Sequence, residues 1–172
     1  KNCKFFVGTQ SGILDTAFLF NKDCLITNIV RIFETPPYTK KSRAICKIPF
    51  VKKTKKLLNL NNYLDLPYSA HHEYFINDKY DYIENTSEEL LIAIKSFLKI
   101  INLKHFSKKN YKNNELIFKS YLTNRFAKLY YNDRDLIHHN QKSKLFKINL
   151  SSKGVYMSSF IKKHFIGEEI VS

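Results

Sequence analysis

The sequence predicts an α/β protein with a parallel sheet, and three observations near its start support that fold class. Residues 3–7 form a short apolar run that is typical of a buried parallel strand. A turn-rich pentad at residues 8–12 follows, and residues 13–20 then place apolar side chains at helical spacing. A second strand-like run occupies residues 24–28. A strand, a tight loop, a helix and a strand form one βαβ unit, which implies a parallel sheet with a right-handed crossover.

Two longer helices are predicted later in the chain. Residues 81–84 have the composition of a strand, and Asn85 or Thr86 is suited to cap a helix over residues 86–101 because glutamates follow in its first turn. Apolar side chains at helical spacing predict a second helix over residues 115–131.

The remaining segments carry weaker signals. Residues 31–67 are expected to be irregular apart from a strand over residues 45–49, which should end at its proline because that residue lacks an amide hydrogen. Polar residues 132–154 are expected to be loose, and a short terminal helix should begin near Ser158, its expected cap.

The length of the chain suits one domain. Its 172 residues suffice for a real core but not for two large domains, and a hydrophobic content of 44% is typical of globular proteins. We expect one domain over residues 1–172, with an α/β core at 1–101 and a helical C-terminal extension at 102–172. Because the chain enters an apolar run directly after Lys1, we expect this domain to be truncated, with further residues upstream.

The net charge of +14, from 29 basic and 15 acidic residues, is typical of proteins that bind polyanions. Nearly all of these basic residues are lysine, however, and the chain is also rich in Asn, Ile and Phe. Codons for all four residues are rich in A and T, so a compositional bias together with a solvated surface explains the lysines. The basic run at residues 52–56 is interpreted in the same way.

The sequence also bears on compartment and on metal binding. Cys3, Cys24 and Cys46 lack the spacing of metal ligands, and we interpret them as reduced thiols of a cytosolic protein. No secretory signal and no apolar run of membrane-spanning length is visible. We therefore expect a cytoplasmic protein without a metal or organic cofactor, with peripheral contact at the inner face of the membrane as an option for its basic surface.

The strongest functional signal is the loop that joins the first strand to the first helix. The first turn of a helix offers unpaired amide hydrogens and a positive dipole end, which favour a phosphate. Glycines allow close approach and positive φ, and Thr9 and Ser11 add hydroxyl groups. The pattern matches neither the dinucleotide fingerprint nor the P-loop, so a plain strand-to-helix turn capped by Ser11 stays open as the alternative.

Three blocks of the chain resemble a family of bacterial glycosyltransferases of GT-B architecture that act on surface polysaccharides. The blocks are residues 5–28, residues 82–90 and residues 155–163. Within the first block, the Gly-x-x-Ser-Gly loop is also similar to that of heptosyltransferases and protein O-fucosyltransferases. The resemblance implies a partial, Rossmann-like C-terminal domain of a GT-B fold, whose N-terminal domain is missing from this chain.

The resemblance also implies an activity and a set of donor-binding residues. The enzyme would bind a nucleotide sugar, without a metal, and transfer the sugar to a surface glycan or lipid-linked acceptor. The implied donor-binding residues are Gly8, Thr9, Gln10, Ser11, Gly12, Thr27, Asn28, Glu84 and Asn85. The catalytic base is unknown, since GT-B enzymes usually supply it from the N-terminal domain. Asp15 and His71 are the only candidates within the chain, and each is also explained as a surface residue.

Two other functions are kept as alternatives. The chain is a non-catalytic α/β scaffold if no N-terminal domain precedes it. A basic nucleic-acid-binding module would use its lysines on phosphates and its Tyr and Phe rings for stacking. The aromatic residues have helical or strand spacing typical of a core, which makes a nucleic-acid partner the less favoured reading.

Overall fold

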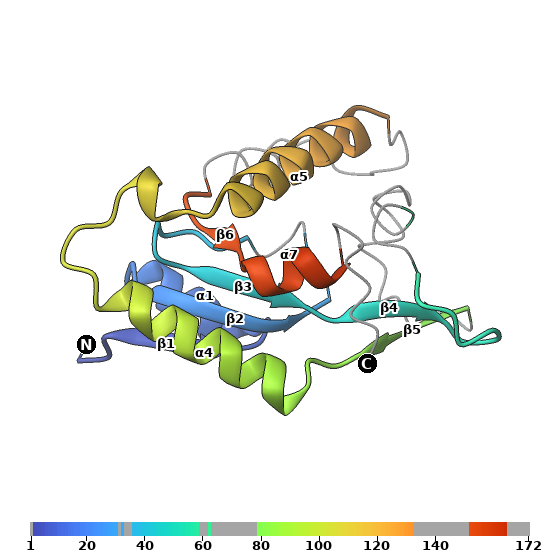
Figure 1. The fold of residues 1–172 in the computed structure, drawn as a ribbon, viewed down its shortest axis with the longest axis horizontal. Coiled ribbons are helices and arrows are strands. Elements are labelled where there is room, and N and C mark those ends of the chain that lie inside the picture. The colour runs from blue at the N-terminus through green and yellow to red at the C-terminus, as the bar shows by residue number, and fades with distance from the viewer. Residues whose placement is uncertain are drawn as a thin grey trace.

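A computed structural model of the protein describes residues 2–30, 32, 36–58, 62, 79–132 and 152–164. Figure 1 shows the arrangement of the helices and strands in these segments. In chain order they are β1 (Phe5–Gly8), α1 (Gly12–Leu19), β2 (Asp23–Ile29), β3 (Arg43–Cys46), β4 (Ile48–Val51), β5 (Tyr80–Ile83), α4 (Ser87–Ile101), the 3-10 helix η1 (Lys108–Asn110), α5 (Asn113–Asn132), β6 (Val155–Tyr156) and α7 (Ser158–His164).

A four-stranded parallel sheet forms the centre of the molecule, in the order β1-β2-β3-β6. Phe5 of β1 lies opposite Asp23 of β2, and Leu25 of β2 lies opposite Arg43 of β3. The crossover between β1 and β2 runs through α1, as the sequence predicts for residues 3–28. The α/β prediction is therefore confirmed, and the architecture is consistent with a partial Rossmann-like domain.

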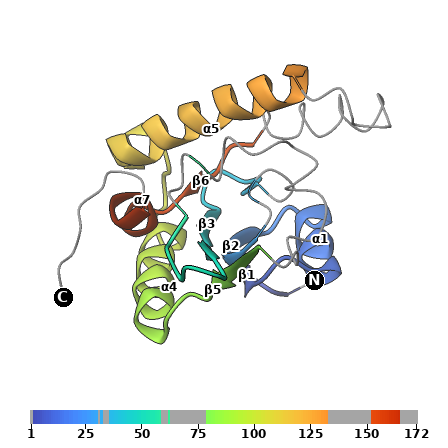
Figure 2. The same cartoon turned by 90° about the vertical axis from the view of Figure 1, so that its right-hand side faces the viewer.

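Helices cover both faces of this sheet. Figure 2 shows α1 on one face, α4 and α7 on the other, and α5 above the β6 end. The central strand β2 is apolar along most of its length, so Leu25 and Ile26 are fully buried. Phe97 of α4 is also fully buried and packs edge-to-face on Phe5 of β1, with 5.7 Å between the ring centroids. These contacts pack α4 against β1 and β2.

The start of α4 confirms the predicted cap. The Thr86 hydroxyl accepts a hydrogen bond from the Glu89 amide at 3.2 Å, and the Glu89 carboxylate accepts one from the Thr86 amide at 2.9 Å. This reciprocal pair satisfies two amides that the first turn of a helix leaves without partners.

The strand expected over residues 45–49 is in fact two strands that belong to different sheets. β3 ends at Cys46, and β4 begins at Ile48 and pairs with β5 as an antiparallel two-stranded sheet. Pro49 therefore lies within β4 instead of ending a strand. A proline is tolerated there because a two-stranded sheet has no central strand, so the missing amide hydrogen removes no hydrogen bond from the middle of a sheet.

The C-terminal segment contributes a strand as well as helices. β6 pairs in parallel with β3, and the Tyr156 hydroxyl donates to the Ile32 carbonyl at 2.9 Å. The sequence predicts only helices beyond residue 101 and not this strand, because two residues are too few to show a strand period. Ser158 is the first residue of α7 and not its cap, since its hydroxyl donates to Glu115 Oε1 at 3.2 Å.

Candidate functional site

The loop between β1 and α1 lies at the carboxyl end of the parallel sheet. Ser11 is the N-cap of α1, with extended backbone (φ −164°, ψ 164°), and its side chain makes no capping hydrogen bond. The first amides of a helix have no acceptor within it, and here they belong to exposed residues, Gly12 and Ile13. Thr9 and Ser11 are exposed as well. The loop therefore presents amide hydrogens and two hydroxyl groups to solvent.

The two glycines of the loop have different roles. A Cβ at Gly12 would meet no atom within 4 Å, so the space in front of the first turn of α1 is open. A Cβ at Gly8 would lie 2.7 Å from the Phe6 ring, which packs against that position. Neither glycine adopts the positive φ that this residue type allows. The left-handed residue at this edge is Asn28, with φ of 51°.

Two hydrogen bonds fix the loop to neighbouring chain. The Thr27 hydroxyl donates to the Gly8 carbonyl at 3.3 Å, and the Val30 amide donates to Gln10 Oε1 at 2.9 Å. Thr27 is buried, so its hydroxyl holds β2 to the end of β1. Thr27 and Gln10 thus anchor the loop, and Thr9, Ser11 and Gly12 form its exposed part.

Asn28 and Asn85 meet at the same edge and bind each other. The Asn28 amide donates to Asn85 Oδ1 at 2.8 Å, and the Asn85 amide donates to Asn28 Oδ1 at 2.7 Å. Asn85 Nδ2 also donates to the Cys46 carbonyl at 2.8 Å. The Asn85 side chain is thereby fully engaged, whereas Asn28 Nδ2 has no partner among the described residues and lies at the edge beside the loop.

Glu84 differs from the other predicted site residues. It follows β5, and β5 belongs to the two-stranded antiparallel sheet, not to the parallel sheet that carries the loop 8–12. Its side chain is 72% exposed and forms an ion pair with Lys47 at 2.8 Å. The structure therefore places Glu84 on the surface, in contact with the start of the β4–β5 arm.

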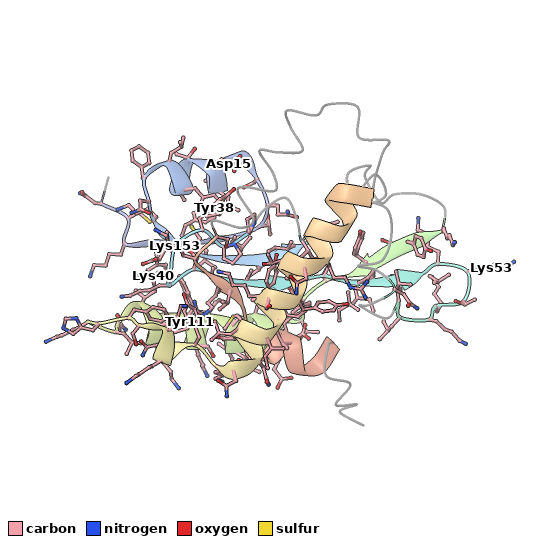
Figure 3. The ribbon with its side chains drawn as sticks, turned by 90° about the horizontal axis from the view of Figure 1, so that it is seen from above. Asp15, Tyr38, Lys40, Lys53, Tyr111 and Lys153 are labelled. Atoms are coloured by element: carbon pink, nitrogen blue, oxygen red, sulfur yellow. The ribbon has the colours of Figure 1, made fainter. Side chains whose placement is uncertain are left out.

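Of the two candidates for the catalytic base, only Asp15 lies within the described residues. Asp15 is exposed in the first turn of α1. Burial raises the pKa of the Tyr38 hydroxyl, and the nearby Asp15 carboxylate raises it further. Figure 3 labels both residues. His71 lies outside the described residues. Among the residues that the structure describes, no three His, Cys, Asp or Glu side chains are grouped as a metal site would require.

A second polar cluster lies where the strands begin, and sequence reasoning missed it. Arg43 is fully buried, and its Nη1 donates to the carbonyls of Lys40 (3.1 Å) and Ser42 (2.9 Å). Its guanidinium lies 5.4 Å from the Phe106 ring centroid and 5.2 Å from that of Tyr111. No local pattern could have revealed this cluster, because its members come from distant parts of the chain.

Glu115 and Lys119 of α5 complete this cluster. Glu115 Oε2 lies 3.9 Å from Arg43 Nη2. Lys119 Nζ donates to the carbonyls of Ser152 and, at 3.0 Å, Gly154. Desolvation is the main cause that lowers the pKa of Lys119 to about 8, and the positive charges of Arg43 and Lys108 contribute to the same shift. The arrangement ties α5 to the chain that precedes β6.

Comparisons with protein-family models, with curated proteins and with solved structures found no match to this chain. Among the described helices, none combines the length and apolar character of a bilayer-spanning segment. Geometry and chemistry at the carboxyl end of the sheet therefore carry the functional argument.

Proposed function

We propose that the chain binds the diphosphate of a nucleotide sugar at the loop 8–12, as the donor-binding part of a glycosyltransferase. One observation carries this proposal: a parallel strand leads into an exposed helix start whose capping hydroxyl is unused. Open α/β sheets bind ligands at the carboxyl ends of their strands, and a helix start favours phosphate oxygens. The acceptor under this proposal is a surface glycan or a lipid-linked sugar.

The surroundings of the loop suit a doubly charged ligand. The open space at Gly12 lets a phosphate oxygen approach the amides of Gly12 and Ile13. The Ser11 hydroxyl is available as a further donor, and Asn28 Nδ2 lies at the neighbouring strand end. Because Thr27 and Gln10 already fix the loop, binding loses little conformational entropy.

The same donors would assist the departure of the nucleotide diphosphate. As the bond to the sugar breaks, negative charge grows on the leaving phosphate, and amide hydrogens aimed at that charge stabilise it more strongly than they stabilise the ground state. The base that deprotonates the acceptor is not assigned to a described residue. The proposed role of this chain is accordingly donor binding and leaving-group stabilisation.

Calorimetric or NMR titration with UDP, GDP, CMP and their sugars tests the proposal, with the free nucleosides as phosphate-free controls. One nucleotide series should bind selectively, and its nucleoside should bind far more weakly. Gly12→Val should abolish binding and leave the circular dichroism spectrum unchanged, because the added side chain would fill open space without touching the fold. Gly12→Ala, with a single methyl group, should give an intermediate loss. Unchanged affinity in Gly12→Val would remove the loop from the site.

A further inference from the structure

Three segments that are distant in sequence meet where the parallel strands begin. They are residues 38–41 before β3, residues 102–112 between α4 and α5, and residues 152–154 before β6. Figure 1 shows the loop between α4 and α5 at this end of the molecule, and Figure 3 shows Lys40, Tyr111 and Lys153 close together. We call this surface the basic end. Its exposed basic side chains are those of Lys40, Lys104, His105, Lys108, Lys109, Lys112 and Lys153.

Hydrogen bonds hold the basic end in one arrangement. The Tyr111 hydroxyl lies 3.1 Å from the Lys40 carbonyl and 2.6 Å from that of Lys153. Lys41 Nζ donates to the carbonyls of Ile101 (3.0 Å) and Leu103 (2.8 Å). These hydrogen bonds therefore hold in place the backbone segments that carry the exposed lysines.

The positive charge of the basic end is scarcely compensated. Residues 102–114 contain four lysines and one histidine and no acidic residue. The next acid in the chain, Glu115, is buried and directed toward Arg43 and Ser158. Asp23 is the hydrogen-bond partner of Thr39, and the exposed Asp15 lies on α1. The basic end thus attracts an extended anionic surface.

The side chains between these lysines indicate which anionic surface fits. The aromatic rings here are already engaged: Phe106 and Tyr111 pack edge-to-face at 5.2 Å, and the Arg43 guanidinium lies against both. They are not placed to stack on bases, and no arginine is exposed at this end. Leu103, by contrast, is 38% exposed directly beside Lys104. An exposed aliphatic side chain in a lysine-rich segment suits the headgroup layer of a membrane.

We propose that the basic end docks onto a bilayer that contains anionic lipids, with Lys104, Lys108 and Lys109 among the headgroups and Leu103 at the acyl-chain boundary. This inference does not rest on the proposed function, because the basic end and the loop 8–12 lie at opposite ends of the parallel strands. A docked molecule leaves the loop facing the aqueous phase.

Vesicle co-sedimentation with matched charge variants tests the docking. The triple variant Lys104→Glu, Lys108→Glu, Lys109→Glu should lose binding to vesicles of phosphatidylcholine and phosphatidylglycerol in equal parts. Each lysine near an anionic surface contributes about fivefold to the partition coefficient, so the loss should be at least roughly a hundredfold. Pure phosphatidylcholine vesicles should bind neither protein, and added salt should weaken binding of the wild type.

The control carries the same change in net charge at the far end of the molecule. Lys52→Glu, Lys53→Glu, Lys56→Glu alters the tip of the β4–β5 arm, and Figure 3 shows Lys53 far from Lys40 and Tyr111. Because the surface potential decays over about 8 Å at physiological ionic strength, this variant should keep its affinity within about threefold. An equal loss in both triple variants would mean that overall charge alone drives adsorption, and it would overturn the assignment of the surface.

A fluorescent reporter tests the position of Leu103. The chain contains no tryptophan, so Leu103→Trp introduces a single probe. Its emission should shift to shorter wavelength with the anionic vesicles and stay unchanged with phosphatidylcholine alone. An unshifted emission in the bound protein, or tighter binding of a single-stranded oligothymidylate than of the vesicles, would refute the membrane assignment. In the second case, loss of oligonucleotide binding in the Lys104, Lys108, Lys109 variant would assign the basic end to nucleic acid.

Discussion

Asn28 and Asn85 exchange hydrogen bonds in both directions across 57 residues of sequence, the amide of each donating to the side-chain oxygen of the other. Asn28 adopts a left-handed backbone, which asparagine tolerates better than most residues, and this directs its side chain to the start of α4. Asn85 adds a third bond to the carbonyl of Cys46 at the end of β3. The pair thus joins β2, β3 and the start of α4 beside the proposed donor loop.

Removing the Asn85 side chain should destabilise the protein by about 3 kcal/mol, because two hydrogen bonds are lost and the Asn28 amide and the Cys46 carbonyl are left unsatisfied. Urea denaturation of Asn85→Ala measures this change. Asn28→Gly should cost only about 1 kcal/mol, since glycine also accepts the left-handed conformation. The exposed Asn102→Ala serves as the control and should stay within about 0.5 kcal/mol of the wild type.

Ser11 and Thr86 are both N-caps, but alanine substitution should affect ligand binding at Ser11 and stability at Thr86. Ser11 makes no capping bond, so Ser11→Ala should leave stability nearly unchanged and weaken nucleotide-sugar binding roughly three- to tenfold through loss of a hydroxyl donor. Thr86→Ala breaks a capping box and should cost about 1 kcal/mol of stability with little effect on binding. Thermal melts and ligand titration measure the two effects. A large loss of stability in Ser11→Ala would show that the hydroxyl is needed for the cap.

Asp15 places a negative charge in the first turn of α1, close to where a diphosphate would bind. Asp15→Asn should therefore tighten nucleotide-diphosphate binding about two- to fivefold at low salt, and the gain should shrink as salt screens the repulsion. Asp15→Glu, which keeps the charge, is the matched control. Weaker binding in Asp15→Asn would show instead that the carboxylate itself contacts the ligand.

Lys119 should make stability depend on pH in an alkaline window. Its pKa falls from 10.5 in the unfolded chain to about 8 in the folded protein, so the unfolded state binds more protons between these values. The unfavourable charged form is fully present below pH 8, and stability should rise relative to a Lys119→Met variant as the pH increases from 8 to 10.5. Urea denaturation of both proteins across this range measures the difference. A constant difference between them would show that burial does not perturb this amine.

Much of the local structure follows from the sequence. The order of β1, α1 and β2, the helices α4 and α5 and the cap at Thr86 depend on side-chain spacing within a few turns or on residues three apart. The same reasoning finds the loop 8–12, since the composition of a strand-to-helix turn is visible in the sequence. It does not show which polar side chains in that region are already engaged. The side chains of Thr27, Gln10 and Asn85 make hydrogen bonds within the protein, whereas Thr9 and Ser11 are exposed.

Pairing between distant segments depends on the tertiary structure alone. β6 has two residues and becomes a strand only because β3 presents a free edge to it, and β5 joins a separate sheet because β4 turns away after Cys46. Arg43 is the clearest case. A charged residue is ordinarily exposed, yet this one is fully buried between Phe106, Tyr111 and Glu115. Periodicity reports neighbours along one helix or strand, whereas burial of a charge depends on partners that only folding brings together.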